Sequence, residues 1–360
     1  MKHAPFREGC RAPALVLALH LCFIGALNAE DPAGRPGTWE NVSEAFTRQI
    51  GAYDIDAAYP YLRRCQGLIV TPPGDLVMQT AKQGICVSKD QGATWSVVAG
   101  NGIAGRCQDA SSLSLAYPYD GRMAFFCYDG AGGVSGGMSL DGARTWTPFS
   151  QLKRGVQFAD VDWSATQPLT IFGVTHEPYL TVLSEDAGKS WRQLDADEDV
   201  GDITCWVGVI DGRRLTRYNK RSGSIESSED SGLTWTQAAY FRVRGGRPVH
   251  YGRKLYWATS KGVIMSVDGK GWTLTGPGAE GACHGPYFGS NDREFIVVTE
   301  RFFLKTLDGG KSWKAISDLY GAPDIFDAKL AYFGWDSTHD ILYASGLGAS
   351  VYRLRLAPSH

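Results

Sequence analysis

The chain has 360 residues, of which 43% are hydrophobic and 21% charged, with a formal net charge of −2 and an isoelectric point near 6.4. A nearly neutral chain exerts no general attraction on phosphate polymers or anionic lipid, which argues against nucleic acid and membrane surfaces as partners. The 44 glycines and 11 tryptophans predict many tight turns between strands that are anchored by aromatic rings.

The first residues have the pattern of a secretory signal peptide. Basic residues such as Lys2 precede an apolar segment from Ala14 to Leu27, and Ala29 supplies a small residue for cleavage. The apolar segment is shorter than the roughly 20 residues of a membrane span. We therefore expect residues 1–29 to be removed near Ala29, and residues 30–360 to be secreted or periplasmic, without membrane insertion.

An octet of the type Ser-x-Asp-x-Gly-x-Thr-Trp recurs along the rest of the chain. It reads SKDQGATW from Ser88, SLDGARTW from Ser139, SEDAGKSW from Ser184, SEDSGLTW from Ser228, SVDGKGW from Ser266 and TLDGGKSW from Thr306. Its aspartates are Asp90, Asp141, Asp186, Asp230, Asp268 and Asp308. Their mean spacing of about 44 residues is the length of one four-stranded propeller blade.

Each unit contains four predicted strands, and the octet lies on the hairpin between the third and the fourth. The first unit reads GLIVTP, DLVMQTA, GICVSK and TWSVVA, which are apolar segments separated by turn residues. In the octet we expect the Asp to accept backbone hydrogen bonds, the Gly to supply a positive φ, and the Trp to be buried. The second copy, with Ala143 where Gly is expected, and the shortened fifth copy predict distorted turns.

A seventh unit without an octet completes the fold. Its strands are AKLAYFGWD, DILYASG and SVYRLRL, and the missing fourth strand is predicted at Thr38–Ser43, which resembles the segments that follow the octets. Pairing of this segment as the outer strand of the last blade would close the ring. The predicted fold is therefore all-β, a single seven-bladed propeller of four-stranded antiparallel blades over residues 30–360.

The octets resemble the Asp-box, or BNR repeat, of sialidases, at one copy per blade over nearly all of the mature chain. The same repeat occurs in xyloglucan-active hydrolases, in sortilin-type receptors and in the seven-bladed Ycf48-like assembly factors of photosystem II. The resemblance implies the architecture, whereas the Arg-Ile-Pro motif of sialidases is absent and sialidases usually have six blades. Some seven-bladed lyases of uronate-containing glycans use His, Tyr and Arg instead.

The loops that enter the first strand of each blade share one face with the loops between the second and third strands. On the entering loops the triplet RCQ occurs at Arg64–Gln66 and again at Arg106–Gln108, and Arg63 lies beside the first copy. Adjacent arginines at a channel mouth would bind a carboxylate through bidentate hydrogen bonds. The alternative is that they pair with Asp54, Asp56 or Asp109 and brace the loops.

The sequence THEPY supplies His176, Glu177 and Tyr179 on a predicted loop of the third blade. These are the candidate catalytic residues: His176 could abstract a proton from a uronate while Tyr179 protonates the leaving oxygen, or Glu177 and Tyr179 could serve a hydrolase. The alternative is an ordinary loop histidine.

Further candidate substrate-binding residues are Arg247, Trp206, His250 and His284. The two histidines belong to inner strands, where they could face the channel or be hydrogen-bonded structural residues. Together with Cys205 and Cys283 they match no familiar zinc spacing, so we expect neither a metal nor a cofactor.

Six cysteines remain in the mature chain, and an even number in an exported protein indicates disulfides. Cys65 and Cys107 occupy equivalent positions of neighbouring blades, and Cys86 and Cys127 lie in the bodies of the same two blades, so we expect the pairs Cys65–Cys107 and Cys86–Cys127. Cys205 and Cys283 lie two blades apart, where they could be free thiols.

Three readings of the function follow. The first is a carbohydrate-active enzyme, a glycoside hydrolase or a polysaccharide lyase, that acts on an acidic oligosaccharide or polysaccharide. The second is a non-catalytic propeller that binds glycan or protein, as in sortilin-like and Ycf48-like proteins, and the third is a purely structural exported module. Because a closed propeller has no free sheet edge, we expect a monomer.

Overall fold

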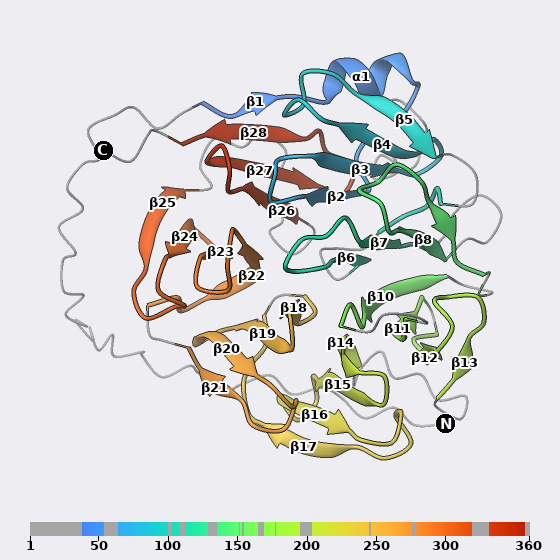
Figure 1. Cartoon of the computed structure of the whole chain (residues 1–360), viewed down its shortest axis with the longest axis vertical. Coiled ribbons are helices and arrows are strands. Elements are labelled where there is room, and N and C mark those ends of the chain that lie inside the picture. Colours follow the sequence, from blue (N-terminus) through green and yellow to red (C-terminus); the bar gives the residue numbers. More distant parts are fainter. Residues whose placement is uncertain are drawn as a thin grey trace, which may run out of the picture. The chain divides into compact units, whose positions relative to one another are not determined.

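The computed structural model describes residues 38–53, 64–99, 103–107, 112–128, 135–150, 152, 155–164, 169–176, 178–194, 204–244, 246–275, 278–318 and 331–356. In these residues, seven sheets of four antiparallel strands are arranged in a ring (Figure 1). This confirms the predicted all-β, seven-bladed propeller. The predicted signal peptide lies outside the described residues.

The first four blades follow one another along the chain, each with its strands in sequence order. Blade 1 contains β2 (Gly67–Val70), β3 (Leu76–Thr80), β4 (Gly84–Ser88) and β5 (Ser96–Ala99). Blade 2 contains β6 (Leu113–Leu115), β7 (Met123–Phe126), β8 (Gly136–Ser139) and β9 (Thr147–Pro148). Blade 3 contains β10 (Val156–Val161), β11 (Ile171–Thr175), β12 (Thr181–Ser184) and β13 (Arg192–Gln193). Blade 4 contains β14 (Thr204–Asp211), β15 (Arg214–Asn219), β16 (Ser224–Ser228) and β17 (Thr236–Ala239).

The next two blades repeat this order, whereas the last blade combines strands from both ends of the described chain. Blade 5 contains β18 (Val249–Tyr251), β19 (Lys254–Thr259), β20 (Gly262–Ser266) and β21 (Thr273–Leu274). Blade 6 contains β22 (Ala282–Phe288), β23 (Phe295–Thr299), β24 (Phe302–Thr306) and β25 (Lys314–Asp318). Blade 7 contains β26 (Ala331–Asp336), β27 (Ile341–Gly346), β28 (Tyr352–Arg355) and β1 (Glu40–Asn41).

Strand β1 is the outermost strand of blade 7, where it pairs antiparallel with β28. It is shorter than the predicted segment Thr38–Ser43, because the chain turns at Ser43 into helix α1 (Glu44–Gln49), which the sequence analysis did not predict. Asn41 Oδ1 accepts the backbone N–H of Glu44 at 2.9 Å, which satisfies one of the free donors at the helix start. Figure 1 shows α1 at the outer edge of the ring beside blade 1.

Each octet forms a hydrogen-bonded turn of its own, as the sequence predicts. In the third copy, Ser184 Oγ donates to Asp186 Oδ1 at 2.9 Å and accepts the N–H of Gly188 at 2.8 Å. Asp186 Oδ1 also accepts the N–H of Ser190 at 2.9 Å, and the hydroxyl of Ser190 donates to Oδ2 at 2.6 Å. These hydrogen bonds lower the pKa of Asp186 from its ordinary value. Each octet therefore fastens the hairpin between the third and fourth strands of its blade.

The second octet is not distorted, contrary to the prediction. Its Ala143 N–H donates to Ser139 Oγ at 2.9 Å, in the same pattern as the third copy. Gly142 and Ala143 have φ values of 73° and 64°, and Ala187 and Gly188 of the third copy have 62° and 80°. Because both turn positions are left-handed in either copy, exchanging the order of alanine and glycine leaves the turn intact.

The fifth octet is altered, as predicted. Asp268 Oδ1 accepts the backbone N–H groups of Lys270 and Gly271 at 2.9 and 3.0 Å, and Gly271 provides no hydroxyl for its second oxygen. The turn is therefore one residue shorter and lacks the side-chain bond that ends the other copies.

In the third and fourth copies the octet glycine approaches the preceding blade closely, in addition to having a positive φ. A Cβ atom on Gly188 would lie 2.2 Å from Phe149 of blade 2, and one on Gly232 would lie 2.6 Å from Leu194 of blade 3. In the third copy the octet tryptophan contacts the same phenylalanine of blade 2: the ring of Trp191 lies edge-on to that of Phe149, with 6.1 Å between centroids. Successive blades are thus packed together through these turns.

No disulfide joins the described cysteines of blades 1 and 2, so the predicted pairs Cys65–Cys107 and Cys86–Cys127 are wrong for this structure. Cys65 Sγ donates to the carbonyl of Gly67 at 3.3 Å, whereas Cys107 Sγ contacts Gln79. Burial raises the pKa of Cys65 and of Cys86 to about 12, so these two thiols are inert at neutral pH. Equivalent positions along two blades do not determine the direction in which each side chain points, so they do not bring these sulfur atoms together.

Candidate functional site

One face of blades 2 and 3 brings together an arginine, a histidine and two tyrosines. Arg106 precedes β6 and Tyr128 follows β7, and the two residues form an isolated antiparallel bridge. His176 follows β11 and Tyr179 precedes β12. All four positions are at the starts of first strands or between second and third strands, which is the face on which the sequence analysis placed the function.

The ring of Tyr128 is the centre of this cluster. The guanidinium carbon of Arg106 lies 4.8 Å from the ring centroid of Tyr128, and the imidazole of His176 stacks on that ring at 3.9 Å between centroids. The ring of Tyr179 lies edge-on to His176 at 6.2 Å. Tyr128 is fully buried, whereas Arg106, His176 and Tyr179 are half-buried and so reach both the protein and solvent.

His176 is held by a hydrogen bond from its other side. Its Nδ1 lies 2.8 Å from Oε1 of Gln157, a buried residue of β10. A carbonyl oxygen can only accept, so the assigned geometry places the proton on Nδ1 and leaves Nε2 as the basic nitrogen. This is the arrangement of a general base whose tautomer is fixed by a buried partner.

A row of aromatic side chains continues this face onto blade 4. Trp206 at the start of β14 stacks on Tyr218 of β15 at 5.7 Å between ring centroids. Trp206 and Tyr179 are both half-buried and pack against the same apolar cluster of blades 3 to 5. The solvent-facing parts of the Tyr179 and Trp206 rings suit the apolar face of a sugar ring.

The other predicted arginine of the first strands has a different partner. Arg64 donates to the hydroxyl of Tyr53 at 2.8 Å, and Arg48 of α1 lies over the same ring at 3.4 Å. Arg64 and Arg106 therefore contact different tyrosines. Arg63 and Glu177 lie outside the described residues.

Arg247 and His250 take part in a buried charge cluster around Asp160, a fully buried residue of β10. Asp160 accepts Arg247 Nη1 at 2.8 Å, His250 Nε2 at 2.9 Å and the backbone N–H of Val209 at 3.1 Å. Burial acts to raise the pKa of Asp160, but the neighbouring charges and hydrogen bonds hold that pKa below its ordinary value. Arg247 Nε also donates to the carbonyl of Leu113 at 2.6 Å, so the cluster joins blades 2 to 5.

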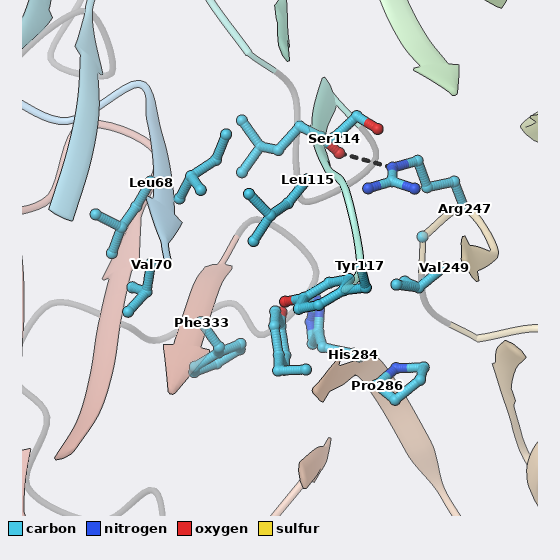
Figure 2. A pocket seen from close by; sticks show the side chains of 15 residues that line it. Leu68, Val70, Ser114, Leu115, Tyr117, Arg247, Val249, His284, Pro286 and Phe333 are labelled. Atoms are coloured by element: carbon cyan, nitrogen blue, oxygen red, sulfur yellow. Dashed lines mark hydrogen bonds between the residues drawn. The ribbon is translucent and has the colours of Figure 1, made fainter. Parts of the chain in front are cut away.

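The channel of the ring is largely filled by apolar side chains. A cavity of about 70 Å³ lies between the first strands of blades 1, 2, 5, 6 and 7, which is room for a few water molecules and too little for a sugar ring. His284 and Arg247 contribute polar atoms to its wall (Figure 2). The labelled apolar side chains in this view are Leu68, Val70, Leu115, Val249, Pro286 and Phe333.

His284 is buried, with its ring edge-on to Phe333 at 5.1 Å. Arg247 and His284 thus line the central cavity, and His250 is hydrogen-bonded to Asp160 of β10. Within the described residues, no group of His, Cys, Asp and Glu side chains is arranged to hold a metal ion. Nor does any helix there have the length and apolar character needed to cross a lipid bilayer.

Two residues of this region, Tyr128 and Gln157, were not predicted, because they come from different blades and their contacts with His176 depend on the fold. Asp160 was expected near the channel mouth, and the structure instead buries it in β10, where its carboxylate is bonded to Arg247 and His250.

No family model matches the chain, and no curated protein is significantly similar in sequence. Its structure is similar to that of a GH74 enzyme from Niastella koreensis, with a TM-score of 0.57 and 16% identity over 82% of this chain and 44% of that one. A GH74 xyloglucanase from Xanthomonas campestris gives 0.55 and 16% over 81% and 43%. A YCF48 protein bound to a D1 peptide gives 0.46 and 11% over 90% and 98%.

Identities this low show the fold alone. The chain spans less than half the length of either GH74 enzyme. The comparisons therefore support the propeller architecture, and the chemistry has to be argued from the residues of this chain.

Proposed function

We propose that this chain is an exported Asp-box propeller that binds an acidic polysaccharide across blades 2 to 4 and cleaves it at a uronate by elimination. The observation that carries the proposal is the position of His176, stacked on Tyr128 and hydrogen-bonded through Nδ1 to Gln157, with Arg106 and Tyr179 beside it.

Elimination at a uronate needs three groups. A base removes the proton alpha to the carboxylate, a cation stabilises the negative charge that develops on that carboxylate, and an acid protonates the departing glycosidic oxygen. His176 Nε2 is the base, Arg106 the cation and the Tyr179 hydroxyl the acid. The electron pair of the broken C–H bond forms the new double bond, and the C–O bond to the leaving sugar breaks.

Hydrolysis would require two carboxyl groups on opposite sides of the glycosidic bond. Asp160 cannot serve, since it is fully buried and bonded to Arg247 and His250. Glu177 would be the remaining acid of the THEPY loop and would supply one carboxyl group. Elimination is therefore the reaction that the described residues support better.

The test is a screen of the purified protein against uronate-containing, sialylated and neutral polysaccharides. New reducing ends together with the ultraviolet absorbance of an unsaturated uronate would support elimination. New reducing ends without that absorbance would replace elimination by hydrolysis and point to Glu177. Cleavage of neutral glycans alone would contradict an acidic substrate.

A second candidate is glycan binding without chemistry. The half-buried rings of Tyr179 and Trp206 favour it, because stacking on sugar rings needs no catalytic group. Binding of a uronate polysaccharide with no turnover, weakened by Trp206→Ala, would support this candidate. In either case we propose that the protein is an exported monomer that needs no cofactor, and Arg63 and Arg64 remain predicted contacts to the glycan.

A further inference from the structure

Cys107 and Cys127 occupy opposite positions on two paired segments of blade 2. The neighbouring residues Arg106 and Tyr128 exchange both backbone hydrogen bonds, each at 3.0 Å. In an antiparallel ladder the pair next to such a hydrogen-bonded pair is a non-hydrogen-bonded one, with Cα atoms about 4.5 Å apart. In this register Cys107 is the residue opposite Cys127, one position beyond the bridge.

The backbone of Cys127 agrees with that register. Its N–H donates to the carbonyl of Ser135 at 3.3 Å and its carbonyl accepts the N–H of Val156 at 2.9 Å. Both groups are thus bonded to segments other than that of Cys107, as a non-hydrogen-bonded pair requires.

The two sulfur atoms also share one partner. Cys107 Sγ donates to Gln79 Oε1 at 2.6 Å, and Gln79 Nε2 lies 2.8 Å from Cys127 Sγ. Both thiols are fully buried and contact the two ends of one amide group, which places them on the same side of the paired segments.

We infer that Cys107 and Cys127 form a cross-strand disulfide when the chain folds in an oxidising compartment. Disulfides join residues whose Cα atoms are about 4.4–6.8 Å apart, a range that includes this position of the ladder. The pairing differs from both pairs that the sequence analysis predicted. Gln79 keeps its hydrogen bond to the carbonyl of Ile103, at 2.7 Å, when the two thiols are oxidised.

The bond forms by thiol–disulfide exchange with an oxidised disulfide donor. One thiolate attacks the donor and releases its first thiol, and the second thiolate attacks the mixed disulfide and releases the second. The chain loses two protons and two electrons, and the donor is reduced to two thiols. Because both sulfur atoms are buried in the folded chain, exchange takes place during folding.

The disulfide would clamp the bridge between Arg106 and Tyr128. These residues carry the guanidinium and the ring on which His176 stacks, so the covalent link would fix the geometry of that face. The inference itself does not depend on what the face binds.

The experiment is to refold the denatured, reduced protein in a buffer of reduced and oxidised glutathione and to map its tryptic peptides without reduction. Trypsin releases residues 107–122 and 123–144 as separate peptides, each with a single cysteine. We expect these two peptides to be joined, with a mass lower by two hydrogen atoms than their sum. Separate peptides, or either one joined to another partner, would overturn the inference.

Counting free thiols in denaturant gives an independent result. Cys107→Ser and Cys127→Ser should each raise the number of free thiols by one relative to the wild type, because each releases the other member of the pair. Cys283→Ser, the control, should lower the number by one if Cys283 is unpaired, as it is in the structure. A lower number of free thiols after replacement of Cys107 or Cys127 would contradict the assignment. The peptide map of the wild-type protein remains a valid test even if a variant does not fold.

Discussion

The guanidinium of Arg247 in blade 5 lies 2.8 Å from the carboxylate of Asp160 in blade 3, so the two blades are joined across blade 4. Neither side chain is more than slightly exposed. An ion pair this deeply buried cannot lose one partner without leaving the other charge desolvated and unpaired.

Asp160→Asn should therefore lower the free energy of unfolding by about 3–5 kcal/mol. Asp292→Asn removes a partly exposed pair with Lys254 and should cost no more than about 1 kcal/mol. Urea denaturation of both variants provides the measurement. Equal, small losses would show that the central charge cluster does not stabilise the ring.

Tyr179→Phe tests the proposed acid, because it keeps the ring beside His176 and removes only the hydroxyl. We expect kcat on a uronate polysaccharide to fall by about 10²–10⁴-fold with little change in the melting temperature. Tyr240→Phe, at an exposed tyrosine, is the matched control. A wild-type kcat in Tyr179→Phe would remove this hydroxyl from the mechanism.

Arg106→Ala should weaken binding of an acidic glycan. A charge-assisted hydrogen bond contributes about 1.5–3 kcal/mol, which corresponds to an increase of about 10–100-fold in Kd. Arg144→Ala changes an exposed arginine of the second octet, on the opposite face, and should leave Kd unchanged. Calorimetric titration with charged and carboxyl-reduced glycan would show whether the loss is specific to the carboxylate.

The octet aspartates predict a loss of stability in acid. Hydrogen bonds from the turn lower the pKa of Asp141, Asp230 and Asp308 to about 2, compared with about 3.9 in an unfolded chain. Because the folded pKa is the lower one, this stabilisation is complete above about pH 4 and disappears as the pH falls towards 2.

The melting temperature should therefore decline below about pH 4, and the triple variant Asp141→Asn, Asp230→Asn, Asp308→Asn should melt lower at pH 7 with a shallower decline in acid. Scanning calorimetry between pH 2 and pH 7 gives both quantities. Parallel curves for the variant and the wild type would refute the assignment.

Gly188→Ala separates the close contact from the backbone strain. Both Gly188 and Gly223 have a positive φ, but a Cβ on Gly188 would meet Phe149 at 2.2 Å, whereas one on Gly223 would meet nothing within 4 Å. Strain costs about 1–2 kcal/mol at either position, and overpacking adds about 1–3 kcal/mol at Gly188 alone. Equal losses in thermal unfolding of the two variants would mean that Phe149 moves aside.

The blades could be predicted from the sequence because each repeat carries a local signal. The octet contains its own hydrogen-bonding partners, so its turn depends little on the rest of the chain. The distorted turn predicted for the second octet was wrong, because two consecutive positions of the turn have a positive φ and not one. Exchanging glycine and alanine between these two positions therefore leaves the turn unchanged.

The candidate site was less predictable, because its contacts cross between blades. The segment THEPY indicated His176 and Tyr179, and the first strands indicated Arg106. The residues that bring them together, Tyr128 and Gln157, are unremarkable where they stand in the sequence. Arg247 and His250 illustrate the converse: their residue types suggested a ligand, and their partner is a carboxylate of the protein itself.

Strand β1 has a consequence for how the protein is made. Its Glu40 binds Arg353, 313 positions further along the chain, so β1 emerges from the ribosome long before its partner exists. Six blades can form as local units during synthesis, whereas the seventh has to wait for its C-terminal strands. Closure of the ring is then a late contact between distant segments, and it can form only after β28 has been synthesised.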